Sequence, residues 1–322
     1  MGKILDITNM IFWVTGILTI TILCIIIVVK FRKALAESYS RLDNIPSQVY
    51  KSNHGDIEYL LKGEGPTILV SHGITGGVDQ GIGFSEDFLG KGYRFLFVSR
   101  FGYLKSSMPD NPSPELQAEV YKELIDYLGI DNIFIFGNSA GGTSAIHFAI
   151  SYSQNCIGLI LLSSNAPLDN PSGHPPKVVF KSNFLYWFVM KLFGKSMLKM
   201  FVPKTVFENL PKQEIKQIID EIYFSALPVT KRTKGILFDL FVSNPSINNE
   251  IRFDSISSPA LIINADDDPA TLVEGARTLA RKIKNSNLLT FETGGHLLLG
   301  HAEEIKNQIS KFASMHNSKS IK

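Results

Sequence analysis

The chain has little cysteine and almost no excess of charge of either sign. Its 322 residues include two cysteines, Cys24 and Cys156, which lie far apart in the sequence. This arrangement excludes a disulfide framework. Lysine and arginine outnumber aspartate and glutamate by 32 to 30, and a formal net charge of +2 is too small to indicate nucleic-acid binding. We therefore expect no nucleic-acid partner.

Several ligand-binding patterns are also absent. The glycine-rich stretch at 71–77 carries neither the G-x-G-x-x-G pattern nor a Walker lysine, which excludes the usual phosphate-cradling loops. No spaced set of oxygen ligands follows the acidic cluster at 266–268, which disfavours a calcium site. We predict neither a metal nor a cofactor. With 44% hydrophobic residues, the chain can nevertheless bury a substantial core.

Charge is missing altogether from Ile11 to Val29, near the N-terminus. These nineteen residues would span roughly 28 Å as a helix, close to the hydrocarbon thickness of a bilayer. We predict one uncleaved transmembrane helix at 11–29, after a short flank at 1–10. A cleaved signal peptide is the main alternative. Its apolar region would be shorter, and here basic residues at 30–33 precede the nearest Ala-x-Ala motif at 34–36.

The basic residues around this run predict its orientation. Lys30, Arg32, Lys33 and Arg41 follow it, whereas Lys3 before it is accompanied by Asp6. The positive-inside rule then places the rest of the chain on the cytoplasmic face, which predicts a single-pass membrane protein with a cytoplasmic domain. Residues 30–50 are polar and are interpreted as a juxtamembrane linker.

Beyond the linker, short apolar runs alternate with amphipathic stretches. Strands are predicted at 57–61, 67–71, 94–99, 133–136, 157–162, 260–264 and 287–291. Helices are predicted at 114–128, 141–152, 271–284 and 302–315. Strands that are apolar throughout and separated by helices are typical of a mostly parallel, doubly wound α/β sheet. The pattern breaks at 165–255, so we predict an α/β core at 51–164 and 256–316 with an inserted cap.

A lone serine stands between small residues directly after the buried strand at 133–136. Residues 137–141 read G-N-S-A-G and match the G-x-S-x-G pattern, with Ser139 at its centre. The flanking Gly137 and Gly141 suit a tight turn from strand to helix, where larger side chains would clash. An ordinary structural turn is the alternative. The strand before the motif and the small-residue helix after it favour a nucleophilic serine.

A serine hydroxyl needs a base, and the base in turn needs a carboxylate. His296 follows the last predicted strand and a glycine pair, and we predict that it is the base; His301, close by, is expected to open the final helix. The carboxylate is expected within the stretch N-A-D-D-D-P. We choose Asp268, just before the proline, with Asp267 as the next choice.

The chain order Ser139, Asp268, His296 is that of one triad fold, and the sequence resembles the α/β-hydrolases over residues 55–315. The resemblance implies that the insertion is the family's cap. It also implies that His72-Gly73 begins the oxyanion loop, with the backbone N–H groups of Ile74 and Ala140 as donors. The family commonly has one aspartate where this chain has three, at 266–268. The loop at 100–107 is expected to be structural or to line the pocket.

A serine at this position argues against dehalogenase and epoxide-hydrolase chemistry, which use a carboxylate there in this fold. We predict a serine hydrolase that cleaves carboxylic esters of small molecules or of lipids with medium or long acyl chains, through an acyl-serine intermediate. A proline-peptidase-like amidase, another reaction of this fold and a non-catalytic binding protein remain alternatives.

The insertion combines bulky apolar residues with regularly spaced lysines. Lysine occurs at positions 177, 181, 191, 195, 199 and 204. One interpretation is a cap helix whose apolar face covers the pocket. The other is a basic amphipathic element at an anionic membrane surface, which would also deliver lipid substrates.

Overall fold

The computed structural model describes residues 2–168 and 176–317, with side chains described from residue 9 onward. The chain divides into two units, Met1–Asn44 and Ile45–Lys322. The first is one helix, α1 (Gly2–Asp43). Its part Asn9–Asp43 is long and apolar enough to cross a membrane, judged by length and composition. The region interpreted as a linker is helical up to residue 43, because strong helix formers such as lysine, alanine and leucine continue the helix beyond the apolar run.

The second unit is built on one eight-stranded sheet, with order β1-β2-β4-β3-β5-β6-β7-β8. The strands are β1 (Gln48–Ser52), β2 (Gly55–Gly63), β3 (Thr67–Ser71), β4 (Arg94–Val98), β5 (Ile133–Asn138), β6 (Cys156–Leu162), β7 (Ala260–Ala265) and β8 (Ser286–Phe291). The pairs β1–β2 and β2–β4 are antiparallel, and the remaining pairs are parallel. The predicted mostly parallel α/β sheet is therefore confirmed.

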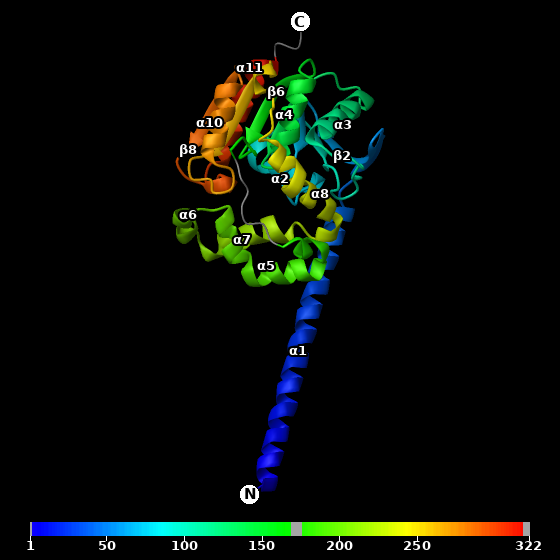
Figure 1. The fold of residues 1–322 in the computed structure, drawn as a ribbon, viewed down its shortest axis with the longest axis vertical. Coiled ribbons are helices and arrows are strands. Elements are labelled where there is room, and N and C mark those ends of the chain that lie inside the picture. The colour runs from blue at the N-terminus through cyan, green and yellow to red at the C-terminus, as the bar shows by residue number, and fades with distance from the viewer. Residues whose placement is uncertain (1, 169–175, 318–322) are drawn as a thin grey trace. The chain divides into compact units, whose positions relative to one another are not determined.

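Helices cover both faces of the sheet (Figure 1). The core helices are α2 (Val78–Phe84), α3 (Pro114–Tyr127), α4 (Gly141–Ser151), α10 (Val273–Lys282) and α11 (Ala302–Asn317). Side chains of β5 alternate between the faces: Ile133 and Ile135 join the apolar cluster under α3, α4 and α10, whereas Phe134 and Phe136 join the cluster under α2 and α11. All four are fully buried, which explains why the strand reads as one continuous apolar run.

Between β6 and β7 the chain forms a helical cap. Its helices are α5 (Asn183–Met197), α6 (Lys204–Asn209), α7 (Lys212–Ile219), α8 (Thr233–Phe238) and α9 (Asn244–Ser246). Figure 1 shows α5, α6 and α7 as a layer beyond one end of the sheet, with α8 between this layer and the core. The insertion begins after the carboxyl end of β6, which is the sheet edge where ligand sites of open α/β folds form.

Strand β1 is an element that the apolar pattern did not predict, since it falls partly within the expected linker. It pairs with β2 from Gln48↔Tyr59 to Ser52↔Gly55 across a two-residue turn. As an edge strand, β1 is mostly exposed and has no apolar run to reveal it.

Candidate active site

Ser139 lies on a sharp turn between β5 and α4. Its φ of 47° is in the left-handed region, which serine rarely adopts. Backbone hydrogen bonds hold this strained turn: the Ser139 N–H donates to the Leu162 carbonyl at 3.1 Å, and the Ser139 carbonyl accepts from the N–H groups of Gly142 and Asn165 at 3.0 and 2.9 Å. The turn presents the half-buried serine at the carboxyl ends of the parallel strands.

The glycines on either side of this serine are required by close packing. A Cβ on Gly137 would lie 2.7 Å from the Cα of Gly142, and one on Gly141 would collide with the carbonyl oxygens of Ser71 and His72. Helix α4 can therefore approach β5 and the end of β3 only because both positions lack a side chain.

The structure brings Ser139, His296 and Asp268 into one chain of hydrogen bonds. The Nε2 atom of His296 lies 3.0 Å from the Ser139 Oγ, and its Nδ1 lies 2.9 Å from an Asp268 carboxylate oxygen. A carboxylate can only accept, so Nδ1 carries the proton and Nε2 is free to accept the serine proton. This is the arrangement that a general base needs for activating a serine hydroxyl.

The Asp268 carboxylate is buried and fully engaged. Its Oδ1 accepts the backbone N–H groups of Ala270 and Thr271 at 2.8 and 3.0 Å, and its Oδ2 accepts the Thr271 hydroxyl at 2.7 Å in addition to His296. Burial by itself would raise the pKa of Asp268, but the charge of His296 and these hydrogen bonds outweigh it, so the pKa is lowered. The carboxylate therefore stays ionised and can stabilise a charged imidazole.

The three neighbouring aspartates have different partners. Asp266 forms an ion pair with Arg277 at 3.0 Å, and an oxygen of Asp267 accepts the Gly295 N–H at 2.8 Å. Only Asp268 contacts the imidazole among the three. Asp267 instead holds the backbone of the loop that carries the histidine. The geometry thus favours Asp268 as the carboxylate of the triad.

The cap contacts the histidine loop directly. The His296 N–H donates to the Phe201 carbonyl at 2.8 Å, and the two ring centroids are 5.6 Å apart. A Cβ on Gly295 would lie 2.5 Å from a Pro203 side-chain atom, so the loop and the cap pack tightly here. The other nearby histidine, His301, is hydrogen-bonded to the Thr293 carbonyl at 3.0 Å and precedes α11.

The expected oxyanion loop lies beside the serine. A Cβ built on Gly73 would be 3.4 Å from the Ser139 Cβ, so the two backbones are neighbours. Neither Ile74 nor Ala140 donates its N–H to another residue in the part of the chain that the structure describes. Ala140 also precedes α4, whose N-terminal dipole favours a negative charge. Both amides are therefore free to donate to a ligand, and their role as oxyanion donors stays a prediction.

His72 and Arg100 fix the orientation of the Gly73–Ile74 peptide. The Gly73 carbonyl accepts from His72 Nδ1 at 2.7 Å and from Arg100 Nη2 at 3.3 Å. In a trans peptide the N–H points away from the carbonyl, so anchoring this carbonyl also fixes the direction of the Ile74 N–H. His72 Nε2 in turn accepts the Arg100 backbone N–H at 3.0 Å. Burial and then the charge of Arg100 hold the pKa of His72 well below its ordinary value, so the ring is neutral.

Two buried ion pairs connect this loop to the cap. Arg100, which also donates to the His72 carbonyl, makes two contacts of 2.6 Å with Asp239 of the cap, and both side chains are almost completely buried. Arg232, also of the cap, donates to the Gly76 carbonyl and pairs with Asp79 at 2.7 Å. A guanidinium presents several donors in a fixed fork, which lets each arginine hold a carbonyl and a carboxylate together.

The positioning residues were not apparent from the sequence. They are Arg100, Arg232, Asp239 and Thr271. None of them belongs to a recognisable sequence motif, and their hydrogen-bond partners are up to 156 positions away in the chain. Thr271 could have been found from the sequence, because an aspartate side chain commonly accepts hydrogen bonds from backbone N–H groups two and three residues ahead and so forms a turn. Such a turn places residue 271 next to Asp268. The loop that starts at Arg100 was expected to be structural or to line the pocket. Arg100 itself has a structural role.

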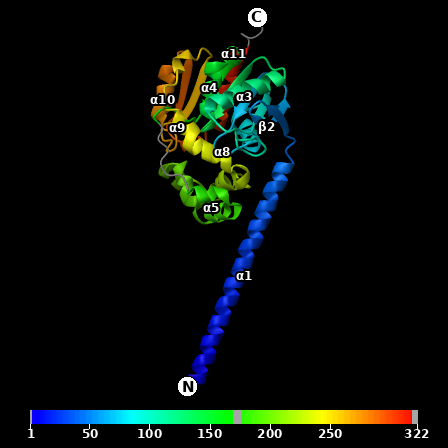
Figure 2. The same ribbon diagram turned by 45° about the vertical axis from the view of Figure 1, so that its right-hand side comes forward.

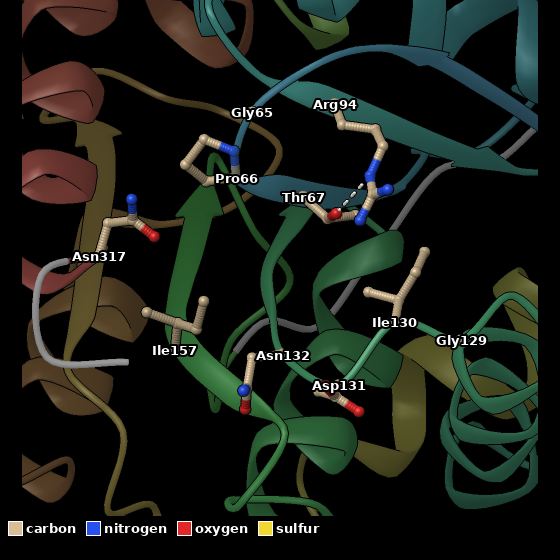
Figure 3. Close-up of a pocket in the computed structure, with 10 residues that line it drawn as sticks. All are labelled: Gly65, Pro66, Thr67, Arg94, Gly129, Ile130, Asp131, Asn132, Ile157 and Asn317. Carbon is tan, nitrogen blue, oxygen red and sulfur yellow. Dashed lines mark hydrogen bonds between the residues drawn. The ribbon is translucent and has the colours of Figure 1, made fainter. Parts of the chain in front are cut away.

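Groups that could hold a metal or a small ligand occur outside the triad. His54, Glu119 and Glu123 bring ligand atoms within 4.8 Å of one another, although Glu123 already accepts from Asn53 at 2.9 Å. A polar cavity of about 280 Å³ is lined by residues at the amino ends of β3 and β4, among them Thr67 and Arg94 (Figure 3). It lies at the opposite sheet edge from Ser139, so it is not the space that faces the triad.

The sequence matches the family model described as "alpha/beta hydrolase fold" over residues 66–301. The chain belongs to this family. An uncharacterized hydrolase of Bacillus subtilis is 27% identical over 260 residues, which is 76% of this chain and 89% of that protein. A 2-hydroxy-6-oxononadienedioate/2-hydroxy-6-oxononatrienedioate hydrolase of Dechloromonas aromatica is 25% identical over 289 residues, covering 83% and 94%.

Solved structures show the same fold. An α/β hydrolase fold protein from Nakamurella multipartita is similar with a TM-score of 0.66 at 21% identity, covering 84% of this chain and 98% of that one. An esterase from Exiguobacterium antarcticum is similar with a TM-score of 0.62 at 21% identity, covering 83% and 99%. At these identities the likeness shows the fold and leaves the substrate open.

Proposed function

We propose that the protein is a membrane-anchored serine hydrolase that cleaves carboxylic esters through an acyl-serine intermediate. The observation that carries the proposal is the continuous hydrogen-bond relay from Ser139 through His296 to Asp268. Family membership and relatives named as hydrolases support hydrolysis in general.

In the proposed reaction, His296 Nε2 removes the Ser139 proton as Oγ attacks the ester carbonyl carbon. The charge on the tetrahedral intermediate is stabilised by the N–H groups of Ile74 and Ala140, and Asp268 stabilises the imidazolium. The imidazolium then gives its proton to the leaving alcohol. Water repeats these steps on the acyl-serine and releases the acid.

The side chains near the relay favour an apolar acyl group. Phe201 lies against the imidazole, and Tyr223 lies 6.5 Å from the Phe201 ring. The second candidate is hydrolysis of a carbon–carbon bond next to a ketone. It is suggested by the name of the Dechloromonas aromatica relative, whose substrate is a dicarboxylate that carries a ketone. A dicarboxylate calls for cationic side chains, whereas Arg100 and Arg232 are each already neutralised by an aspartate. We therefore favour a monocarboxylic ester.

The N-terminal helix supports the anchored part of the proposal. Its length and composition suit a membrane span, and the basic residues after its apolar run favour a cytoplasmic location for the second unit. A cleaved leader is the alternative, because a signal sequence near the N-terminus can also satisfy the criteria of length and composition for a membrane span. Sequencing the N-terminus of the mature protein and extracting it from membranes distinguish the two. An anchor predicts an intact N-terminal segment and a protein that detergent extracts and alkaline carbonate does not, whereas a cleaved leader predicts a shortened N-terminus.

A fluorophosphonate probe and an ester panel test the chemistry. The full chain in detergent should be labelled at Ser139 and should hydrolyse p-nitrophenyl esters, with acyl chains of graded length defining the preference. Ser139→Ala should lose both signals. Absence of labelling and of turnover in the folded protein would favour a non-catalytic binding protein. Turnover of proline-containing amides in preference to esters would favour the amidase.

A further inference from the structure

The cap concentrates positive charge to a degree that the rest of the chain does not share. Residues 176–207 contain six lysines and no acidic residue, which is a charge of +6. Because the whole chain carries +2, the remaining residues together carry −4. The hydrolase chemistry proposed above does not use these lysines.

Apolar side chains are exposed on the same element. Eight of the fourteen large apolar side chains exposed within residues 45–317, as far as the structure describes them, belong to the cap insertion at 165–255. Among them, Phe184 is 41% exposed and Leu192 is 59% exposed, both on α5. Both ribbon views place α5 as the outermost helix of the cap, on the side away from the sheet (Figures 1 and 2).

Exposed lysines and apolar residues occur along α5 and in the short helical turns that flank it, at Lys177–Lys181 and Leu198–Met200. Most of them are three, four or seven positions from the next, which is the spacing of one helix side, and we call this set the basic cap face: Lys181, Phe184, Lys191, Leu192, Lys195 and Lys199. Among the described residues, no ion pair within 4 Å neutralises any of its four lysines. The Lys191 ammonium lies instead 4.0 Å from the centroid of the Phe224 ring.

We propose that the basic cap face binds the anionic surface of a lipid bilayer. A helix with lysines and large apolar side chains on its exposed side suits the boundary between headgroups and acyl chains, since lysine stems can lie along apolar groups while the ammonium reaches phosphate. The chain also supplies a tether. Helix α1 continues from 30 to 43, about 20 Å beyond the uncharged run, and β1 begins at Gln48.

Site-specific fluorescence in lipid nanodiscs tests this contact on the full chain. Cys156 is buried, so Cys24→Ser with Leu192→Cys leaves one accessible thiol for an NBD label. With phosphatidylglycerol present, the label should shift its emission to the blue and be quenched by nitroxide lipids. In phosphatidylcholine alone both effects should be lost. They should also weaken in 1 M salt, where the screening length is about 3 Å.

Charge reversal provides a matched comparison. Lys191→Glu, Lys195→Glu and Lys199→Glu combined should abolish the quenching at 192. The combination Lys62→Glu, Lys284→Glu and Lys311→Glu changes net charge equally, at exposed positions outside the cap, and should leave the quenching intact. Circular dichroism melts of both triple variants confirm that each remains folded.

A label on the native Cys24 reports separately whether α1 enters the bilayer. In anionic nanodiscs, a label at position 24 that is quenched by nitroxide lipids, together with a label at position 192 that stays exposed to water, would overturn the proposal. So would equal quenching at 192 in neutral and anionic lipid. A blue shift at 192 in detergent that grows with protein concentration would assign the face to a second copy of the chain and would overturn it as well. None of these readouts depends on ester hydrolysis.

Discussion

Replacing Arg100 by lysine is the sharpest test of how this site is organised. The Arg100 side chain makes four contacts: one to the His72 carbonyl at 2.8 Å, one to the Gly73 carbonyl at 3.3 Å, and two of 2.6 Å to Asp239. Lysine keeps the charge opposite Asp239 but lacks the fixed fork, so it cannot hold both carbonyls as well. The Gly73–Ile74 peptide, and with it the Ile74 N–H, should lose its exact support.

The size of the effect follows from the role of that peptide. Deleting one oxyanion donor costs about 2.7–4 kcal/mol of transition-state stabilisation. A donor that is displaced rather than deleted should lose about 1.4–2.7 kcal/mol, which is 10- to 100-fold in kcat. KM should change little, because the donor acts on charge that appears in the transition state. The lost hydrogen bonds to a charged group should also lower the free energy of unfolding, by about 2–3 kcal/mol.

Steady-state kinetics with a p-nitrophenyl ester, together with denaturant unfolding, measure both quantities. The matched control is Arg94→Lys, since Arg94 donates to Thr67 at 2.9 Å near the opposite sheet edge (Figure 3). This variant should keep kcat. An Arg100→Lys protein that folds with wild-type kcat, or that changes KM alone, would refute the reasoning about the oxyanion peptide.

Three further predictions concern the triad and its supports. Ser139→Ala and His296→Ala should each lower kcat, measured by ester turnover, by about 10⁴-fold or more. The melting temperature, measured by calorimetry, should change little, and unfolding of both variants would mean that these residues are structural. Asp268→Asn should lower kcat by about 10⁴-fold and Asp267→Asn by much less, and the reverse order in ester turnover would move the triad carboxylate to 267. The third prediction is a pH effect. Burial lowers the pKa of His72 in the fold, so below about pH 6.5 the unfolded chain binds a proton that the folded protein does not. Stability in denaturant titrations should therefore fall as pH drops from 7 to 5. His72→Gln should flatten this dependence, and an unchanged slope would contradict the assignment.

Much of the fold could be predicted because buried parallel strands are apolar on both faces. Apolar runs such as Ile133–Phe136 and Ile157–Leu162 can be recognised as strands without knowing which strands they pair with. The structure places both runs in the sheet, as β5 and β6. Strand β1 was missed because an exposed edge strand has no such run. The helices of the cap were not predicted individually, since several are shorter than nine residues and reveal little periodicity.

The candidate triad was also predictable in type and order. Ser139 is marked by its glycines, whose absence of side chains is required by the packing of α4, and His296 is marked by its loop after the last strand. The choice among three adjacent aspartates was open in the sequence. The choice depends on the direction in which each of the three neighbouring side chains points in the folded loop. Asp266 contacts Arg277, Asp267 contacts the Gly295 N–H, and Asp268 contacts the imidazole.

The sequence by itself determined the α/β architecture, the serine within its G-x-S-x-G motif, the apolar N-terminal run and the lysine spacing of the cap. Each of these is a local feature: a short motif, an uninterrupted run, or a repeat at the period of a strand or a helix. Only the tertiary structure decided which residues hold the oxyanion loop. Arg100 and Asp239 are 139 positions apart, and they meet because the cap folds back over the sheet edge and both charges, removed from water, must be satisfied there. No local pattern encodes such a meeting, since it depends on the paths of two distant segments.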